Sequence, residues 1–342
     1  MIKEINGDLT HDLLIANENP KYRYESGAYS KEYCARLRKK FNALLGIDKI
    51  KKNACPENFN IEFTEKKDGY TLTRFTFDSE VGSTVPCYLL IPDTGKKKYP
   101  VAITMQGHST GFHNSIGVVK YEDDKRYADG RGALALQAVK HGYIALAIEQ
   151  RAMGERSATT EGRREGVACS FNALSAFLLG RTIIGERCYD ISKAIDALKH
   201  FKKCDLSKIF ITGNSGGGTA SYYAAAYDKR IKLSVPSCAF CSFDKSITYT
   251  FHCPCNYIPN ALNYFDMQDV APLIAPRKLI IVAGKDDPIF LLDGVKKGFE
   301  TVKAVYKDAG AEDSAKLIVT PKGHWWCVDI VWNAIDEEVK KW

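Results

Sequence analysis

Hydrophobic residues near the start of the chain recur at helical spacing. Between residues 30 and 46 this spacing predicts an amphipathic helix that Ser30 caps and Gly46 ends. Its apolar face consists of residues four, four and three positions apart: Tyr33, Leu37, Phe41 and Leu44. Residues 1–55 are therefore expected to form a helical extension that precedes the main domain.

From about residue 58 the pattern changes to short apolar runs of strand length. Residues 61–63 and 70–77 surround a turn-like segment and predict an antiparallel pair, which residues 85–91 extend. Six later runs are apolar enough for strands buried on both faces of a sheet: 101–105, 143–148, 209–212, 232–235, 279–282 and 317–319. Helical patterns separate several of them, with apolar positions in 191–198, 295–306 and 328–335.

This order of elements predicts the fold class. An antiparallel start followed by repeated strand–helix units indicates an α/β protein with a mostly parallel central sheet and helices on both faces. Residues 56–342 are expected to form one catalytic domain. The stretch at about 152–185 is longer than a simple crossover needs, so it is expected to be a small cap insertion over the active site.

Composition and charge exclude several classes of protein. With 45% hydrophobic residues among 342, the chain can bury a large core and is not disordered. The longest apolar runs are too short for a membrane helix, and the N-terminus lacks the apolar stretch of a signal peptide, so a cytoplasmic protein without membrane contact is expected. The net charge of +7 is spread over short separated basic clusters, which favours a solvated surface over a nucleic-acid site.

The segment around Ser215 carries the strongest chemical signal. A strand-like run, residues 209–212, leads into Gly213-Asn214-Ser215-Gly216-Gly217, and an alanine-rich helical stretch follows. A strand, Gly-x-Ser-x-Gly and a helix in this order are typical of a nucleophile elbow, where a strained serine sits at a helix N-terminus. The alternative is a glycine-rich turn without a catalytic role. We predict that Ser215 is a nucleophile.

A serine hydroxyl needs a base, and the base needs an acid that orients it. In this fold the chain order should be Ser, then Asp or Glu, then His, with each residue after a strand. His324 follows the last strand-like run and is the predicted base. Asp287 follows the previous one and is the predicted acid; Asp286 beside it and Asp244, after the strand at 232–235, are alternatives.

Acyl transfer also needs hydrogen-bond donors for the oxyanion. The main-chain N–H of Gly216, directly after the nucleophile, is one candidate. The second is expected in the loop after residues 101–105, where Gly107 allows a close approach and the N–H of His108 or Ser109 would face the oxygen. A tight turn without a catalytic role is the alternative for this loop.

The chain resembles the α/β-hydrolase superfamily, in its acetyl xylan esterase and dienelactone-hydrolase-like branch. The matching residues are Gln106-Gly107-His108, the run from Glu149 to Glu155, the segment around Ser215, Gly284 to Pro288, and Gly323-His324. The resemblance covers roughly residues 55–342 and implies a Ser-His-Asp esterase without a cofactor. Dienelactone hydrolases carry a cysteine nucleophile, so Ser215 points to simple esters. In such proteins Arg151 is structural and pairs with a carboxylate such as Glu155.

Eleven cysteines are many for a chain of this kind. Five potential metal ligands fall within 18 positions: Cys238, Cys241, His252, Cys253 and Cys255. Zinc sites use Cys-x-x-Cys pairs, but Cys253 and Cys255 are separated by one residue only. Packed free thiols and no bound metal are therefore expected, and a zinc site or a redox-labile pair remain the alternatives.

These observations predict a serine carboxylesterase that removes short acyl groups, most plausibly acetyl, from carbohydrates or related small molecules. Its partner is then a small-molecule ester, and no nucleic acid is involved. The helical extension could supply a contact in a homo-oligomer. The rival functions are a peptidase or amidase of the prolyl-oligopeptidase type, and a non-catalytic binding protein on the same fold.

Overall fold

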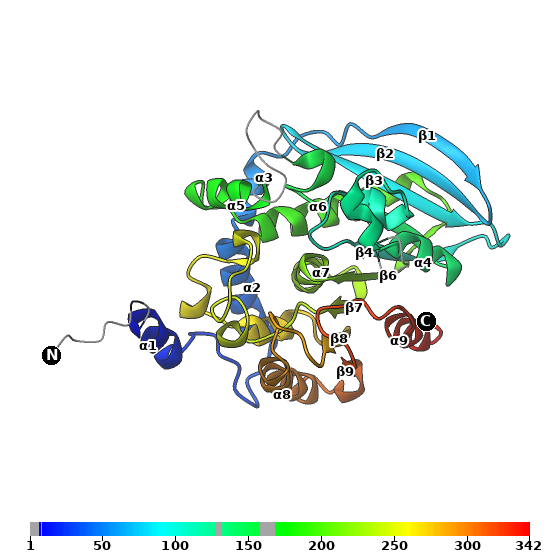
Figure 1. The fold of residues 1–342 in the computed structure, drawn as a ribbon. Helices are drawn as coiled ribbons and strands as arrows, with labels where there is room; N and C mark the ends of the chain where they lie inside the picture. Colours follow the sequence, from blue (N-terminus) through cyan, green and yellow to red (C-terminus); the bar gives the residue numbers. More distant parts are fainter. Residues whose placement is uncertain (1–6, 8, 128–131, 158–167) are drawn as a thin grey trace.

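A single mixed β-sheet carries the fold of the computed structural model, which describes residue 7 and residues 9–127, 132–157 and 168–342 (Figure 1). The described strands follow the spatial order β1-β2-β3-β5-β4-β6-β7-β8-β9. Their bounds are β1 (Asn60–Lys67), β2 (Tyr70–Glu80), β3 (Ser83–Pro92), β4 (Tyr99–Met105), β5 (Ile144–Ile148), β6 (Cys204–Asn214), β7 (Ile231–Ser237), β8 (Lys278–Gly284) and β9 (Ala315–Thr320). Each run predicted as a strand overlaps one of these, so the predicted strands are confirmed.

The direction of pairing changes once across the sheet. Strands β1, β2, β3 and β5 pair antiparallel in that order, whereas β5, β4, β6, β7, β8 and β9 pair parallel. The predicted antiparallel start and mostly parallel centre are therefore confirmed. Because the carboxyl ends of parallel strands meet at one edge of the sheet, the loops after β4, β6, β8 and β9 are brought together there.

Helices cover both faces of the sheet, as predicted. The α-helices are α1 (Leu9–Asn17), α2 (Lys31–Leu45), α3 (Ile47–Lys52), α4 (Leu134–Lys140), α5 (Ala168–Leu178), α6 (Ile183–Ala197), α7 (Gly216–Tyr227), α8 (Leu292–Asp308) and α9 (Val328–Val339). Figure 1 shows α4 and α9 on one side of the sheet and α2, α6, α7 and α8 on the other. Alternation along β4 explains both layers, because Val101 and Ile103 join the core under α6 and α7, and Ala102 joins the core under α4 and α9.

Helix α2 begins and ends where the sequence predicts. The Ser30 hydroxyl accepts a hydrogen bond from the Tyr33 N–H at 3.1 Å, and Gly46 takes the left-handed conformation with φ 74°. Phe41 is fully buried in the same apolar cluster as the sheet and stacks on Tyr223 of α7. The N-terminal helix α2 therefore belongs to the core of the sheet domain.

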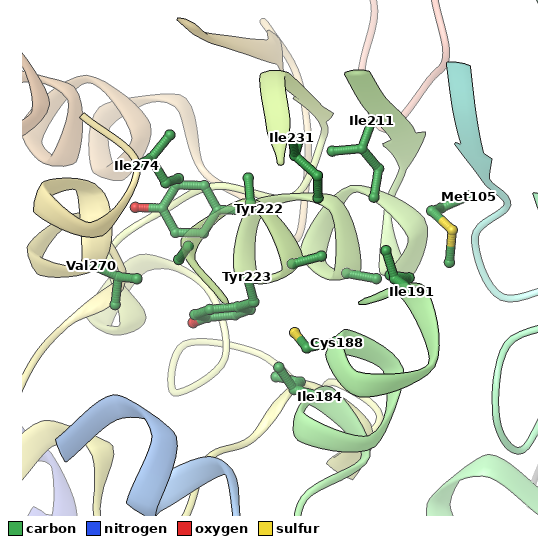
Figure 2. Packing of buried hydrophobic residues seen from close by; sticks show 14 of the residues in the cluster. Met105, Ile184, Cys188, Ile191, Ile211, Tyr222, Tyr223, Ile231, Val270 and Ile274 are labelled. Carbon is green, nitrogen blue, oxygen red and sulfur yellow. The ribbon is translucent and has the colours of Figure 1, made fainter. Parts of the chain in front are cut away.

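Helix α6 packs along α7 and is buried on most of its surface. Ile184, Cys188 and Ile191, at positions i, i+4 and i+7, point toward α7 (Figure 2). The predicted helix at 191–198 is confirmed but begins earlier, at Ile183, inside the predicted cap insertion. Helix α5 also lies in that insertion, whose residues 158–167 fall outside the described part of the chain.

In the described part of the chain, no single helix has both the length and the apolar character that a membrane span requires. One pair of helices, Ala168–Leu178 and Ile183–His200, has the required length and apolar character only when the two are counted together, and the chain bends by 97° between them.

Candidate active site

Ser215 stands at a sharp turn between β6 and α7. Its backbone is strained, with φ 56° and ψ −127°, values that a residue other than glycine rarely adopts. The glycines on either side are required by close packing, since a Cβ at Gly213 would lie 2.3 Å from the Met105 carbonyl oxygen and a Cβ at Gly217 only 2.0 Å from it. The Gly-x-Ser-x-Gly segment thus forms the tight strand-to-helix turn that its pattern predicts.

Asp287 and His324 meet across the loops that follow β8 and β9. The imidazole Nδ1 of His324 lies 2.8 Å from Oδ2 of Asp287. The other carboxylate oxygen accepts hydrogen bonds from the main-chain N–H groups of Ile289 and Phe290, at 3.0 and 3.1 Å. Asp287 is fully buried as a side chain, and His324 is about one-quarter exposed, at 24%. The carboxylate therefore holds the ring in one orientation, with Nδ1–H as the donor.

The alternative acids lie elsewhere. Asp286 is exposed to solvent, although it is adjacent to Asp287 in the chain. Asp244 accepts a hydrogen bond from Lys297 at 3.3 Å. Of the three aspartates considered from the sequence, only Asp287 contacts the His324 ring.

Ser215 and His324 line the same cavity, which has a volume of about 250 Å³. The other residues around it come from the loop after β4, from the segment that leads into α4, from the end of β6 and from the loop after β9: Gln106, Gly107, His108, Ser109, Asn114, Arg126, Tyr127, Gly132, Leu134, Asn214 and Trp326. Most of these side chains are polar. The structure thus brings the serine, the histidine and the predicted oxyanion loop to one cavity.

The loop after β4 packs directly on the turn at Ser215. A Cβ at Gly107 would lie 2.9 Å from the Asn214 carbonyl oxygen and 3.3 Å from Cβ of Ser215. The His108 ring lies against Gly216, whose added Cβ would come within 3.0 Å of Nδ1. Within the described residues the main-chain N–H of His108 donates to no other group, and that of Gly216 opens α7, where helix N–H groups lack partners inside the helix. Both N–H groups are available to an oxyanion.

Glu149 and Gln150, which follow β5, hold the loop after β4 in place. No role was predicted for either residue from the sequence. The Gln106 side chain donates to Oε1 of Glu149 at 3.1 Å, and the Gln150 side chain donates to the Gln106 carbonyl oxygen. Glu149 also accepts the main-chain N–H of Phe112 at 3.2 Å. Burial raises the pKa of Glu149 to about 8. The available signal was a carboxylate directly after a strand buried on both faces.

Arg151 is structural, as the resemblance implies, but the expected partner was wrong. Its guanidinium pairs with Glu80 at 2.6 Å, with Asp190 at 2.8 Å and with Glu186 at 3.3 Å. Glu155 pairs instead with Arg74, at 2.6 Å. The reason is geometric, because Arg151 faces the buried side of α6, whereas Glu155 lies near the surface of β2.

The five candidate metal ligands from the sequence do not gather at one place. The thiol of Cys238 lies near the Gly323 and Trp325 carbonyl oxygens beside His324, and burial raises its pKa to about 12. Cys241 contacts the Lys245 and Leu291 carbonyl oxygens. The ring of His252 contacts the Ile289 carbonyl oxygen at 3.0 Å. Only Cys253 and Cys255 come together, with two residues that the sequence analysis had not grouped with them: Cys169 and His108.

Solved structures with the same fold include several esterases. A structure from Bacteroides fragilis NCTC 9343, provisionally named an acetyl xylan esterase, superposes with a TM-score of 0.78 at 18% identity and covers 98% of this chain and 96% of its own. A glucuronoyl esterase from Solibacter usitatus gives 0.65 at 15% identity, over 95% and 98% of the two chains. The acetyl xylan esterase of Paenibacillus sp. R4 gives 0.61 at 17% identity, over 94% and 97%. These neighbours confirm the predicted fold, and two of the three carry the name acetyl xylan esterase.

Sequence comparison gives the same assignment. A Bacillus subtilis (strain 168) protein, provisionally named hydrolase YtaP, is 26% identical over 297 residues, which are 85% of this chain and 93% of that protein. The model of the abhydrolase family matches residues 8–322 and so includes the N-terminal helices as well as the sheet. With a match over most of its length, this chain belongs to the abhydrolase family.

Proposed function

We propose that this protein is a serine carboxylesterase that hydrolyses short-chain esters, in particular acetyl esters, of carbohydrates or related small molecules. The observation that carries the proposal is the hydrogen bond between His324 and buried Asp287 at the edge of a cavity that Ser215 also lines. A strained serine, an oriented imidazole and two available N–H groups are the parts that acyl transfer requires.

In the proposed mechanism Ser215 Oγ attacks the ester carbonyl and passes its proton to Nε2 of His324. Asp287 stabilises the imidazolium that forms, and the N–H groups of Gly216 and His108 bind the oxyanion. The tetrahedral intermediate expels the alcohol, which takes the proton from His324 and leaves an acyl group on Ser215. Water, deprotonated by His324, then attacks the acyl-enzyme and releases the acid.

The size and lining of the cavity support the substrate class. A volume of about 250 Å³ suits a small acyl group better than a long acyl chain, and lining side chains such as Gln106, Asn114 and Asn214 offer hydrogen bonds to a hydroxylated alcohol. The names of the structural neighbours, acetyl xylan esterase and glucuronoyl esterase, point in the same direction. The choice of carbohydrate rests on this likeness.

The test compares the wild type with Ser215→Ala on p-nitrophenyl acetate, butyrate and octanoate, and on acetylated xylo-oligosaccharides. We expect a preference for acetate and a fall in kcat on the order of 10⁴–10⁶ for Ser215→Ala, since only binding and oxyanion stabilisation would remain. Ser221→Ala is the matched control, because this serine of α7 is buried away from the cavity and its hydroxyl donates to the Gly217 carbonyl oxygen. Equal and slow turnover by the wild type and Ser215→Ala would contradict the esterase. Cleavage of aminoacyl-anilides by the wild type would favour a peptidase instead.

A further inference from the structure

Three cysteines and one histidine converge beside the cavity. Each offers one ligand atom, and these four atoms all lie within 4.8 Å of one another: they belong to His108, Cys169, Cys253 and Cys255. They come from three separate segments, namely the loop after β4, the first turn of α5 and the segment that includes the short helix Pro254–Asn256. Cys169 and Cys255 are buried, Cys253 is half-buried, and His108 is exposed where it lines the cavity.

The spacing of these atoms matches a four-coordinate site. Around a tetrahedral Zn²⁺ with bonds of about 2.3 Å to sulfur and 2.0 Å to nitrogen, ligand atoms lie about 3.5–3.8 Å apart. The Nε2 of His108 lies 3.3 Å from Sγ of Cys255, and the widest separation allowed in the group is 4.8 Å. Small rotations of the side chains would close the set around one ion. Three thiolates and one imidazole are also a known ligand set of structural zinc sites.

The buried charges around α6 support the same site. On one side of α6, three buried or half-buried carboxylates face three guanidinium groups in a connected set of ion pairs: Glu80, Glu186 and Asp190 with Arg151, Arg156 and Arg181. Three negative charges balance three positive charges in this set. No carboxylate of the set is therefore left to neutralise a further cation nearby.

Arg187 is that further cation. It is 3% exposed and, among the described residues, forms no ion pair with a carboxylate. Its guanidinium donates to Sγ of Cys169 at 3.4 Å, to Sγ of Cys255 at 3.5 Å and to the Arg151 carbonyl oxygen at 3.1 Å. Arginine remains protonated in proteins, and a buried charge without a counter-charge is costly. The compensating negative charge is thus needed at the three thiols of Cys169, Cys253 and Cys255, which together with His108 are called the sulfur cluster below.

We propose that His108, Cys169, Cys253 and Cys255 bind one Zn²⁺ ion in a structural site. The ion displaces the three thiol protons, so that two positive charges, three thiolates and a neutral imidazole leave a net charge of −1. Arg187 neutralises that charge. With four protein ligands the ion keeps no open position for substrate, so it acts by holding the chain together. This proposal takes the place of the packed free thiols predicted from the sequence.

The site would also position the predicted oxyanion donor, a consequence that rests on the proposed function. With the His108 ring bound through Nε2, its other edge lies against Gly216, and His108 is one of the residues that line the cavity. Because the ring is tied to α5 and to residues 253–255, the backbone at 108 is held against the turn at Ser215. His108 is in this respect a positioning residue for its own N–H group.

The metal content of the full-length protein, purified without chelators and freed of loose metal by gel filtration, tests the proposal. We expect one zinc per chain by elemental analysis, and loss of most of it in Cys169→Ser and in Cys253→Ser. Cys241→Ser is the matched control and should retain one zinc, since this thiol lies outside the four-residue group and contacts the Lys245 and Leu291 carbonyl oxygens. Zinc absent from the wild type, or retained equally by all the variants, would overturn the proposal.

Cobalt replacement gives a readout that does not depend on the stability of the variants. The wild type refolded or exchanged with Co²⁺ should show thiolate charge-transfer bands and the intense visible bands of a tetrahedral site. A disulfide among Cys169, Cys253 and Cys255, found by mass spectrometry of the alkylated protein, would overturn the proposal in favour of a redox pair. Ser215→Ala should keep its zinc while losing turnover, so failure of the esterase and failure of the metal site are separate results.

Discussion

Replacement of Asp287 by asparagine tests the role of the buried carboxylate with little change of shape. The Asp287 carboxylate uses one oxygen for the N–H groups of Ile289 and Phe290 and the other for Nδ1 of His324. In Asp287→Asn the amide oxygen should stay on the two N–H groups, which places the NH₂ group opposite Nδ1. Nδ1 must then become an acceptor, and the ring hydrogen moves to Nε2, where it prevents the imidazole from taking the serine proton.

The expected loss is in kcat. In serine proteases the corresponding change of tautomer lowers kcat by about 10⁴, which equals about 5.5 kcal/mol in the activation free energy. KM for p-nitrophenyl acetate should change little, because Asp287 is buried behind His324 and does not line the cavity. Thermal unfolding should be nearly unaltered, since the bonds to Ile289 and Phe290 remain.

Asp286→Asn is the matched control, as it makes the same change at the exposed neighbour. It should keep wild-type kcat within about twofold, as surface substitutions usually do little. If Asp287→Asn retained more than about a tenth of the wild-type kcat, or if Asp286→Asn were the inactive variant, the assignment of the acid would be refuted.

Three further substitutions probe the loop, a buried carboxylate and the core. Gly107→Ala should lower kcat about tenfold to a hundredfold and slightly lower the midpoint of thermal unfolding, because its Cβ would lie 2.9 Å from the Asn214 carbonyl oxygen and the loop would have to move off the turn. Glu149 keeps its proton up to a pKa of about 8 when folded and releases it near 4.5 when unfolded, so the free energy of unfolding should fall as pH rises between these values. Across this pH interval the free energy of unfolding, measured by urea titration, should fall by up to about 5 kcal/mol more in the wild type than in Glu149→Gln. An equal fall in both proteins would contradict the raised pKa. Phe41→Ala should lower the free energy of unfolding by about 3–5 kcal/mol in the same assay, whereas Leu13→Ala on exposed α1 should be neutral.

The fold was predictable because each strand has a recognisable pattern in its own local sequence. The centre of the sheet is buried on both faces, so its strands must be continuous apolar runs, and the sequence displays these runs in order. Helix α2 carries its own start and stop signals in Ser30 and Gly46. The beginning of α6 was missed because this helix is buried nearly all round, and its first turns carry Glu186 and Arg187 where an apolar face would be expected.

The residues that meet at the candidate site were predictable for a related reason. The fold places each of them after a strand, so chain order indicates Ser215 and His324 and limits the acid to Asp287, Asp286 or Asp244. The contact with His324 then selects Asp287. The partners of Arg151 and the ligand set at His108 depend on which distant segments fold together. Cys169 lies 61 positions after His108 and 84 before Cys253 in the chain. Nothing in local spacing connects them, and the nearby Cys238 and Cys241 offered a more regular pattern.

The position of Ser215 relative to the loop after β4 depends on helix α6. One face of α6, with Cys188, packs on α7, whose first residue follows Ser215 (Figure 2). The adjacent residue Arg187 points to the sulfur cluster that includes His108 as its fourth ligand. A shift of α6 by a fraction of a turn would therefore move Ser215 and the His108 N–H in different directions. The three ion pairs of Arg151 and the compensated charge of Arg187 oppose such a shift, since any rotation would leave buried charges without partners. Burying charged residues in α6 is costly for the free energy of folding, but it gives this helix one defined rotation, which the geometry of the proposed oxyanion site requires.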